Sequence, residues 1–195
     1  RADGISEADY WKKAYDEAIK VYRSSAYTLV TDYSSLFTDD NENSSESIFE
    51  LQISQDAANS QMGRNYSPWK WKKTLAFGWF KVHADVYDDH VATYPNDSRI
   101  AGTYISEWIR ADNGNTAKFY PANASRSSYF NANPYFFKFA EKDQTSTTQY
   151  NSQNIIVYRY AELLIMLAEI SNELQNGEQM IYVQQVLDRA SATPH

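Results

Sequence analysis

The sequence contains no cysteine, only six glycines and five prolines, and no long apolar run. The absence of cysteine excludes a disulfide scaffold, a thiolate zinc site and thiol catalysis. The scarcity of glycine argues against a nucleotide-binding cradle, and the chain has no Gly-rich phosphate loop and no Gly-x-Ser-x-Gly motif. A spanning helix needs a run of about 18 apolar residues, and none is present. The sequence therefore predicts no cofactor and no membrane span.

Basic residues are also in the minority. The chain has 18 Lys and Arg against 25 Asp and Glu, which gives a formal net charge of -7 at pH 7. Nucleic-acid binding needs a basic footprint, so nucleic acid is not an expected partner. Hydrophobic residues make up 43% of the chain, which excludes a disordered acidic tail. The length of 195 residues fits one domain or part of a larger one.

Aromatic residues are the abundant class. The chain has 16 tyrosines, nine phenylalanines and five tryptophans, but only nine leucines. Tyrosine and tryptophan combine a flat apolar face with a polar group, which suits wet binding surfaces as well as cores. The aromatic excess therefore allows two interpretations for each residue, packing or ligand contact.

Helical patterns are found at both ends of the chain. Ser6 and Asp9 resemble a capping box. They precede an apolar stripe at helical spacing: Ala8, Trp11, Tyr15, Ala18 and Tyr22. Near the other end, residues 155–157 are expected either to be extended or to lead into a helix that follows them. A second helix is expected to turn Met180, Val183, Val186 and Leu187 inward. Gly177 suits the left-handed position after the first of these two helices, so they form an αα-hairpin.

The middle of the chain is less regular. Phe49, Leu51 and Ile53 alternate with Glu50 and Gln52, which predicts a half-buried strand with the apolar side chains inward. Residues 84–91 fit a short helix, and residues 94–97 fit a turn. Residues 101–154 predict irregular structure with short strands. The expected fold is therefore mainly α with a loop-rich segment.

One pair of carboxylates is compatible with glycoside hydrolysis. Glu162 and Glu169 lie seven positions apart on one helix face, about 10.5 Å along the axis, which is at the edge of the range for an inverting pair. Arg159 lies one turn before Glu162. The alternative interpretation is a structural carboxylate, buried at least in part and satisfied by Arg159 or by backbone N–H groups.

Two histidines have the residue type of metal ligands. His83 and His90 are seven positions apart with three aspartates between them. Imidazole and carboxylate groups can bind zinc, but this spacing matches no known set of ligands. A solvated acidic helix face is the favoured interpretation, and no metal site is predicted.

A cluster of aromatic residues lies outside any periodic element. A sugar ring can stack its CH-rich face on an aromatic plane while nearby Asn, Asp and Arg side chains bond its hydroxyls. This region mixes those residue types, which indicates carbohydrate binding. The candidate ligand-binding residues are Tyr66, Trp69, Trp71, Trp79, Trp108 and Tyr120. The alternative is that Trp71 and Trp79 fill gaps beneath long loops.

Several short motifs together resemble the SusD/RagB-like proteins. Residues Tyr158–Glu169 are similar to the family's Arg-Tyr-Ala-Glu…Leu-Leu…Ala-Glu helix, and Ser45–Glu50 to its Ser-Glu-Ser-Ile-Phe-Glu strand. Asp97-Ser98-Arg99 resembles its Asp-Pro-Arg turn, with serine in place of proline. Shared order and spacing extend the resemblance over about residues 8–189.

The resemblance implies a SusD-like fold with tetratricopeptide-type helices, in which residues 1–195 are part of a single domain. Family members are longer lipoproteins, so the chain is expected to be an internal fragment without the lipoprotein signal, the N-terminal helices and the C-terminal segment. The implied function is non-catalytic oligosaccharide binding at the surface of the outer membrane, with a SusC-like TonB-dependent transporter as partner. Asp97 and Arg99 are then structural, and Arg159, Glu162 and Glu169 pack the helix.

Two alternatives stay open at this point. One is a glycoside hydrolase fragment that uses Glu162 and Glu169. The other is a protein-interaction scaffold that binds the transporter without a ligand.

Overall fold

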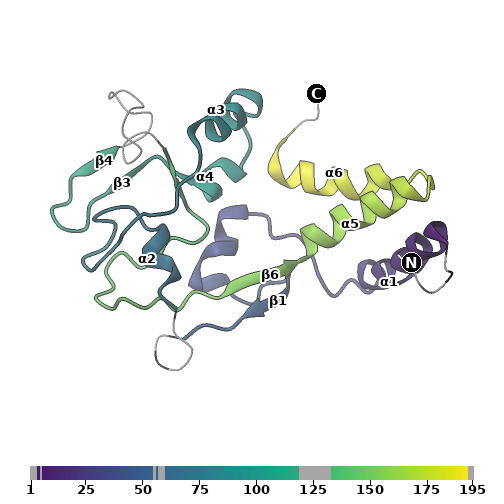
Figure 1. The fold of residues 1–195 in the computed structure, drawn as a ribbon, viewed down its shortest axis with the longest axis horizontal. Coiled ribbons are helices and arrows are strands. Elements are labelled where there is room, and N and C mark those ends of the chain that lie inside the picture. The colour runs from purple at the N-terminus through teal and green to yellow at the C-terminus, as the bar shows by residue number, and fades with distance from the viewer. Residues whose placement is uncertain (1–3, 5, 55, 57–59, 119–132, 193–195) are drawn as a thin grey trace. The chain divides into compact units, whose positions relative to one another are not determined.

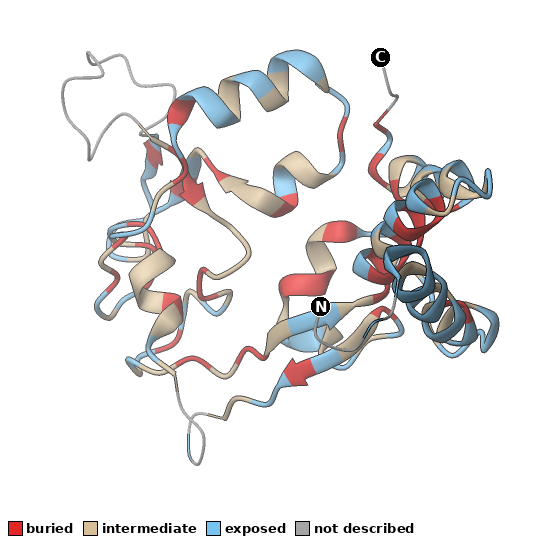
Figure 2. Cartoon of the chain, turned by 45° about the vertical axis from the view of Figure 1, so that its right-hand side comes forward, coloured by how far each residue is buried: buried red, intermediate tan, exposed pale blue. Residues whose placement is uncertain are grey.

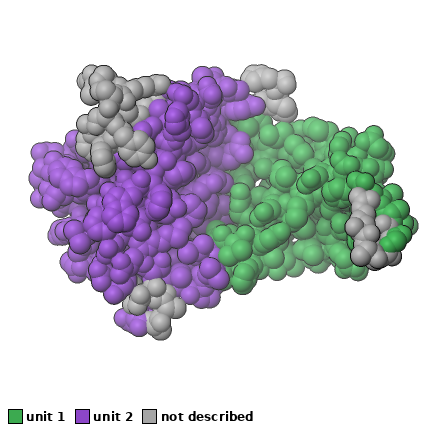
Figure 3. Space-filling view, in the orientation of Figure 1, with its two compact units in different colours: residues 1–31, 43–50, 156–195 green, residues 32–42, 51–155 purple. Residues whose placement is uncertain are grey.

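The computed structural model describes residues 4, 6–54, 56, 60–118 and 133–192. The chain divides into two compact units, shown in different colours in Figure 3. Unit 1 consists of residues 1–31, 43–50 and 156–195, and unit 2 of residues 32–42 and 51–155. That both units are parts of a single domain stays a prediction.

Unit 1 is built on three helices, α1 (Glu7–Arg23), α5 (Tyr160–Glu173) and α6 (Gln179–Ala190). The Ser6 hydroxyl caps α1 by accepting a hydrogen bond from the Asp9 N–H at 3.2 Å, as its sequence predicts. Helix α5 contacts both α1 and α6 (Figure 1). The buried core of this unit comprises Ile19, Tyr160, Ala161, Leu163, Leu164, Leu167, Ala168, Tyr182 and Val186.

Two details of the helical hairpin differ from expectation. Helix α6 buries Tyr182, Val186 and Ala190, whereas Met180 is exposed. Gln175, not Gly177, is the first residue after α5 with positive φ (52°), although Gly177 also has positive φ (82°). The link therefore needs two left-handed residues, and glycine occupies only the second.

The strand predicted around Phe49 exists, but its faces are reversed. Strand β1 (Ser47–Leu51) pairs with β6 (Ile155–Arg159) in a two-stranded sheet, so the strand around Phe49 is confirmed and residues 155–157 adopt the extended one of their two expected conformations. Phe49 is 54% exposed, whereas Glu50 is buried and accepts a hydrogen bond from the Asn43 N–H at 3.0 Å. Alternation shows which residues share a face but not which face is inside. Here the buried carboxylate of Glu50 accepts a backbone hydrogen bond, and the Phe49 ring lies on the exposed face.

Unit 2 is loop-rich with short elements, as predicted. Its helical segments are η1 (Tyr33–Phe37), η2 (Asp39–Asn41), α2 (Met62–Tyr66), α3 (Ala84–Thr93) and α4 (Arg99–Thr103). Its short antiparallel pairs are β2 (Tyr104–Ile105) with β5 (Tyr135–Phe136), and β3 (Glu107–Ile109) with β4 (Thr116–Lys118). Helix α3 confirms the helix expected over 84–91, and only Ala84 of this helix is buried (Figure 2).

Aromatic and small residues form the core of unit 2: Trp71, Ala76, Ile105, Trp108, Ala117, Tyr135 and Ala140. The mainly helical fold class expected from the sequence is confirmed. In the part of the chain that the structure describes, no helix combines the length and apolar character that crossing a bilayer requires.

Candidate functional site

The structure separates the candidate tryptophans into buried and exposed residues. Trp71 is 8% exposed and Trp108 is 4% exposed, so the expectation that they lie at the surface is wrong. The Trp71 indole N–H donates to the Glu141 carbonyl, and that of Trp108 donates to the Trp69 carbonyl at 3.1 Å. Long loops leave space that large rings fill, and the buried N–H groups find backbone acceptors there. The gap-filling interpretation therefore holds for Trp71 and extends to Trp108.

The two tyrosine candidates do not form an open platform. Tyr66 is half-buried, and its ring centroid lies 4.9 Å from Phe80, 5.8 Å from Phe136 and 4.9 Å from Phe139. Tyr66 therefore belongs to an aromatic packing cluster. Tyr120 lies outside the described residues.

Trp69 is exposed, but cations already contact its ring. It is 47% exposed, and the Arg110 guanidinium lies 4.6 Å from the ring centroid, with the Lys70 ammonium at 5.4 Å. Arg110 also donates two hydrogen bonds to Asp112, at 3.0 and 2.7 Å, and these lower the pKa of the Asp112 carboxyl. Trp69 is thus part of a surface cluster of one ring, two cations and one carboxylate.

Trp79 is the most exposed of the candidate rings in the described residues, at 57%. Its indole stacks on Phe77 with the centroids 4.7 Å apart and the planes at 8°. The Arg64 guanidinium lies 4.6 Å from the Phe77 centroid and donates to the Gln149 side chain at 3.0 Å. Trp79 therefore combines an exposed ring with a fixed neighbour.

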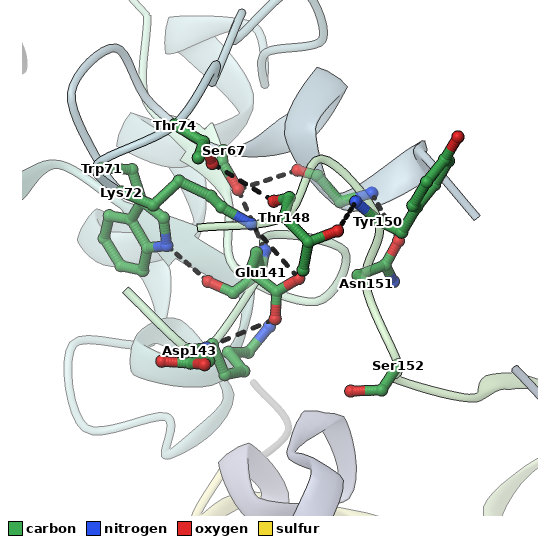
Figure 4. Close-up of polar contacts among 12 residues, drawn as sticks. Ser67, Trp71, Lys72, Thr74, Glu141, Asp143, Thr148, Tyr150, Asn151 and Ser152 are labelled. Atoms are coloured by element: carbon green, nitrogen blue, oxygen red, sulfur yellow. Dashed lines mark hydrogen bonds and ion pairs between the residues drawn. The ribbon is translucent and has the colours of Figure 1, made fainter. Parts of the chain in front are cut away.

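A buried polar network fixes the loop that carries these tryptophans (Figure 4). The Ser67 hydroxyl donates to the Gly63 carbonyl at 2.7 Å and accepts from the Glu141 N–H at 2.9 Å. The Lys72 ammonium lies 3.7 Å from the Glu141 carboxylate, and both side chains are buried. Burial raises the pKa of Glu141 and lowers that of Lys72, so each group depends on the other for its charge. Buried contacts of Ser67 and Lys72 therefore fix the loop that contains Trp69 and Trp71.

The predicted carboxylate constellation is not assembled. Glu162 and Glu169 are exposed on α5, and the Arg159 guanidinium donates to Glu46 at 2.7 Å instead. Arg159 is the extended residue before α5 (φ -138°, ψ 160°), so helical spacing does not place it beside Glu162. The expectation that Glu162 or Glu169 is a partly buried packing residue satisfied by Arg159 is wrong.

The Asp97–Arg99 turn is a buried polar cluster. Arg99 donates to the Asp97 carboxylate from its backbone N–H at 2.8 Å and from its guanidinium at 2.6 Å. One ring nitrogen of His90 lies 3.0 Å from Asp97, and the other lies 2.9 Å from the Tyr104 hydroxyl. Burial opposes ionisation of Asp97, but the hydrogen bonds from Arg99 and His90 outweigh it and lower its pKa to about 2. The geometry fits a structural turn.

The histidines do not form a metal centre together. His83 is exposed and caps α3 by accepting from the Asp85 N–H at 3.3 Å, whereas His90 faces the buried Asp97. The interpretation of His90 as part of a solvated acidic face is therefore wrong. Within the described ranges, no group of three or more His, Cys, Asp or Glu side chains is arranged to hold a metal ion.

Sequence reasoning missed Phe77 and Gly78 as parts of the site. The signal was present in the segment Leu75-Ala76-Phe77-Gly78-Trp79, where large apolar residues alternate with very small ones. The structure buries the two small residues and leaves Leu75 and Trp79 exposed.

Comparisons with known proteins agree with this fold. Residues 11–195 match the sequence model of the SusD family. The surface glycan-binding protein A from Bacteroides thetaiotaomicron, solved in complex with laminarihexaose, is 24% identical with a TM-score of 0.75, over 97% of this chain and 44% of that one. A SusD superfamily protein from Parabacteroides distasonis is 21% identical with a TM-score of 0.75, over 96% and 40%. The surface glycan-binding protein A from Bacteroides uniformis is 19% identical with a TM-score of 0.73, over 97% and 40%.

The chain therefore spans less than half of the length of these structures. No curated protein matches the sequence significantly.

Proposed function

Because the chain belongs to the SusD family, we propose that it is part of a cell-surface protein that binds oligosaccharides for nutrient uptake. The fold supports this proposal, since similar structures include surface glycan-binding proteins, one of them in complex with laminarihexaose. The family resemblance adds two further elements to the proposal: a lipid anchor at the outer membrane, and a SusC-like TonB-dependent transporter as partner.

The observation that carries the proposal is the exposure of Trp79 and Trp69 on a fixed loop. Large apolar side chains are usually buried, and an exposed group of them marks a binding surface more often than chance. A tryptophan ring offers a sugar both a flat apolar face and an N–H donor. Of the six candidate residues from the sequence, Trp69 and Trp79 are therefore the ones proposed here as ligand contacts.

We assign no bond cleavage to the chain. The only carboxylate pair that suggested hydrolysis, Glu162 and Glu169, lies on the exposed side of α5 in unit 1. A glycosidase raises the pKa of its acid by placing it in a cleft or apolar pocket, and an exposed helix face offers neither. Binding without catalysis is therefore the proposed activity.

Affinity gel electrophoresis and calorimetry with a panel of laminarin, xylan, starch, cellohexaose and polygalacturonate would test the proposal. We expect saturable binding to at least one of these glycans, with loss of binding in the double variant Trp69→Ala/Trp79→Ala. Phe49→Ala is the matched control, because Phe49 is an equally exposed ring in β1. Absence of binding to every glycan, combined with co-purification of a transporter, would favour the interaction scaffold instead.

A further inference from the structure

The segment from Leu75 to Trp79 has an inverted pattern of burial. Leu75 and Trp79 are exposed and Phe77 is half-exposed, whereas Ala76 and Gly78 are buried. In most half-buried segments the large apolar residues point inward. Here the two smallest residues face the core of unit 2, and the three largest face outward.

Close packing explains why the inward positions are small. A Cβ atom at Gly78 would lie 2.5 Å from Cε1 of Tyr135 and 3.3 Å from the Ser67 carbonyl oxygen, and Gly78 has a φ of +57°. Ala76 lies in the core cluster with Trp71 and Trp108. No larger residue fits at either position without displacing the core. The outward direction of the three large side chains is therefore fixed by the packing beneath them.

The backbone and the side chains of this segment are both tied to α2. The Phe77 N–H donates to the Arg64 carbonyl and the Trp79 N–H to the Asn65 carbonyl, each at 2.8 Å. The Phe77 ring contacts the Arg64 guanidinium at 4.6 Å and the Trp79 indole at 4.7 Å. A ring held in this way loses little further freedom when a ligand stacks on it, which favours binding.

One face of the Trp79 indole lies against Phe77, so the exposed area belongs mainly to the opposite face and the edge. No other ring or cation of the described residues stacks on that outer face. Trp69 differs, because Arg110 and Lys70 already contact its ring. The two exposed tryptophans, which the sequence does not distinguish, therefore differ in what already contacts their rings.

We propose that the outer face of Trp79 is the stacking subsite for a pyranose ring of a neutral glycan, and that Phe77 and Arg64 are positioning residues. The proposal rests on the proposed function and deepens it, since it names the contact and the class of glycan. The neutral class follows from charge, because a chain with a net charge of -7 repels an acidic polysaccharide. The flat ring face suits the CH-rich face of a sugar, while the indole edge offers an N–H to its hydroxyls.

Calorimetry with laminarin, cellohexaose, starch and polygalacturonate tests the subsite on single variants of the chain. Trp79→Ala is expected to weaken binding of the neutral glycan about tenfold or more, and Trp79→Phe less. Phe49→Ala is the matched control, because Phe49 is an exposed ring in β1 outside the proposed site, and it is expected to change affinity by less than about threefold. Circular dichroism of each variant checks that the fold is retained.

The positioning role of Phe77 needs a readout that a loss of fold would not produce. The indole N–H resonance of Trp79 in a ¹⁵N correlation spectrum, assigned by its absence in Trp79→Phe, is expected to shift on addition of glycan. Phe77→Leu is expected to broaden or move this resonance before glycan is added and to weaken binding, with affinity restored in Phe77→Tyr.

The outcomes separate the subsite from the proposed function. Unchanged affinity in Trp79→Ala, with binding lost in Trp69→Ala, overturns the subsite and leaves glycan binding intact. Tightest binding to polygalacturonate overturns the neutral class. Failure of the unaltered chain to bind any glycan contradicts the subsite and the proposed function together.

Discussion

Glu46 and Arg189 lie 143 positions apart in the sequence, and their side chains form a buried ion pair at 2.9 Å. The Glu46 side chain is fully buried and also accepts hydrogen bonds from the Arg159 guanidinium at 2.7 Å and the Val30 N–H at 2.8 Å. One carboxylate, directly before β1, therefore joins the segment that follows α1, the end of β6 and helix α6. A buried carboxylate needs such partners because water is absent around it.

Removal of this charge should destabilise unit 1. Glu46→Gln leaves two guanidinium groups without their anion, and we expect the free energy of unfolding to fall by about 3 kcal/mol. Urea denaturation followed by circular dichroism measures this change. The same substitution at the exposed Glu162 is the control and is expected to stay within about 0.5 kcal/mol of the unaltered chain. Equal effects at the two positions would contradict the assigned role of Glu46.

Two glycines with positive φ allow the cost of backbone strain on substitution to be measured separately from the cost of a packing clash. Gly78 (φ +57°) faces Tyr135, whereas Gly114 (φ +74°) has no atom within 4 Å of the place a Cβ would take. Gly114→Ala should cost about 1 kcal/mol for the backbone conformation alone. Gly78→Ala should cost about 2 kcal/mol more, because the Tyr135 ring must move. Thermal unfolding of both variants measures the difference, and similar melting temperatures would exclude the close approach.

Lys81 predicts a pH dependence of stability. Its ammonium lies 4.5 Å from the Tyr135 ring centroid, and burial lowers the pKa of Lys81 from 10.5 to about 8. Between about pH 8 and 10.5 the unfolded chain binds this proton more strongly than the folded chain, so stability rises with pH across that window. Lys81→Met removes the penalty, and its gain over the unaltered chain should be largest below pH 8 and disappear towards pH 10.5.

Urea denaturation at a series of pH values from 7 to 10 measures this effect. Lys73→Met is the control, because Lys73 is exposed. The pH series of this variant gives the baseline for loss of an exposed lysine. A constant difference between Lys81→Met and the unaltered chain over the same series would refute the prediction.

Asp97 and Asp112 each form an ion pair with an arginine, and the two pairs differ in how far the aspartate is buried. Each accepts two or more hydrogen bonds from an arginine two positions away, but the Asp97 side chain is fully buried and the Asp112 side chain is 31% exposed. We expect Asp97→Asn to lower the free energy of unfolding by about 2–3 kcal/mol and Asp112→Asn to lower it by clearly less.

Because the pKa of Asp97 is lowered in the folded chain, its contribution to stability should be lost at acid pH, which acid denaturation can measure. The folded value of about 2 lies below the ordinary 3.8, so the stability it provides is fully present above pH 3.8 and is lost as the pH falls towards 2. Asp97→Asn should therefore be less sensitive to acid in this window, although less stable at neutral pH. An identical acid dependence in both chains would show that Asp97 does not contribute.

The sequence predicts the elements of this fold better than their faces. The Ser6 cap, the two C-terminal helices and the extended segments follow from local patterns, and all are found. Strand β1 was also expected, but alternation alone could not show that Glu50 rather than Phe49 is buried, since that depends on partners elsewhere in the chain. The partner of Arg159 illustrates the same limit, because Glu46 lies 113 positions away.

The tryptophans show a further limit. Trp69 and Trp71 stand two positions apart in one loop, and only the first is exposed. Composition and periodicity give no reason to distinguish them. Trp71 is buried because a loop distant in sequence covers it and supplies the Glu141 carbonyl that accepts its N–H. Only Trp79 carried a local signal, the small residue that precedes it, because Gly78 marks the side of the segment that faces the core.

The interleaving of the two units has a consequence for how the protein is made. A ribosome delivers α1 first and α5 and α6 last, so the helical core of unit 1 cannot form until nearly all of the chain has been synthesised. Unit 2 has all its segments once residue 155 has emerged. Until then α1 lacks α5, the helix that it packs against in unit 1, and a single helix of this length is only marginally stable in water. In nascent chains stalled before residue 156, we therefore expect unit 2 to resist protease digestion and α1 to be cleaved.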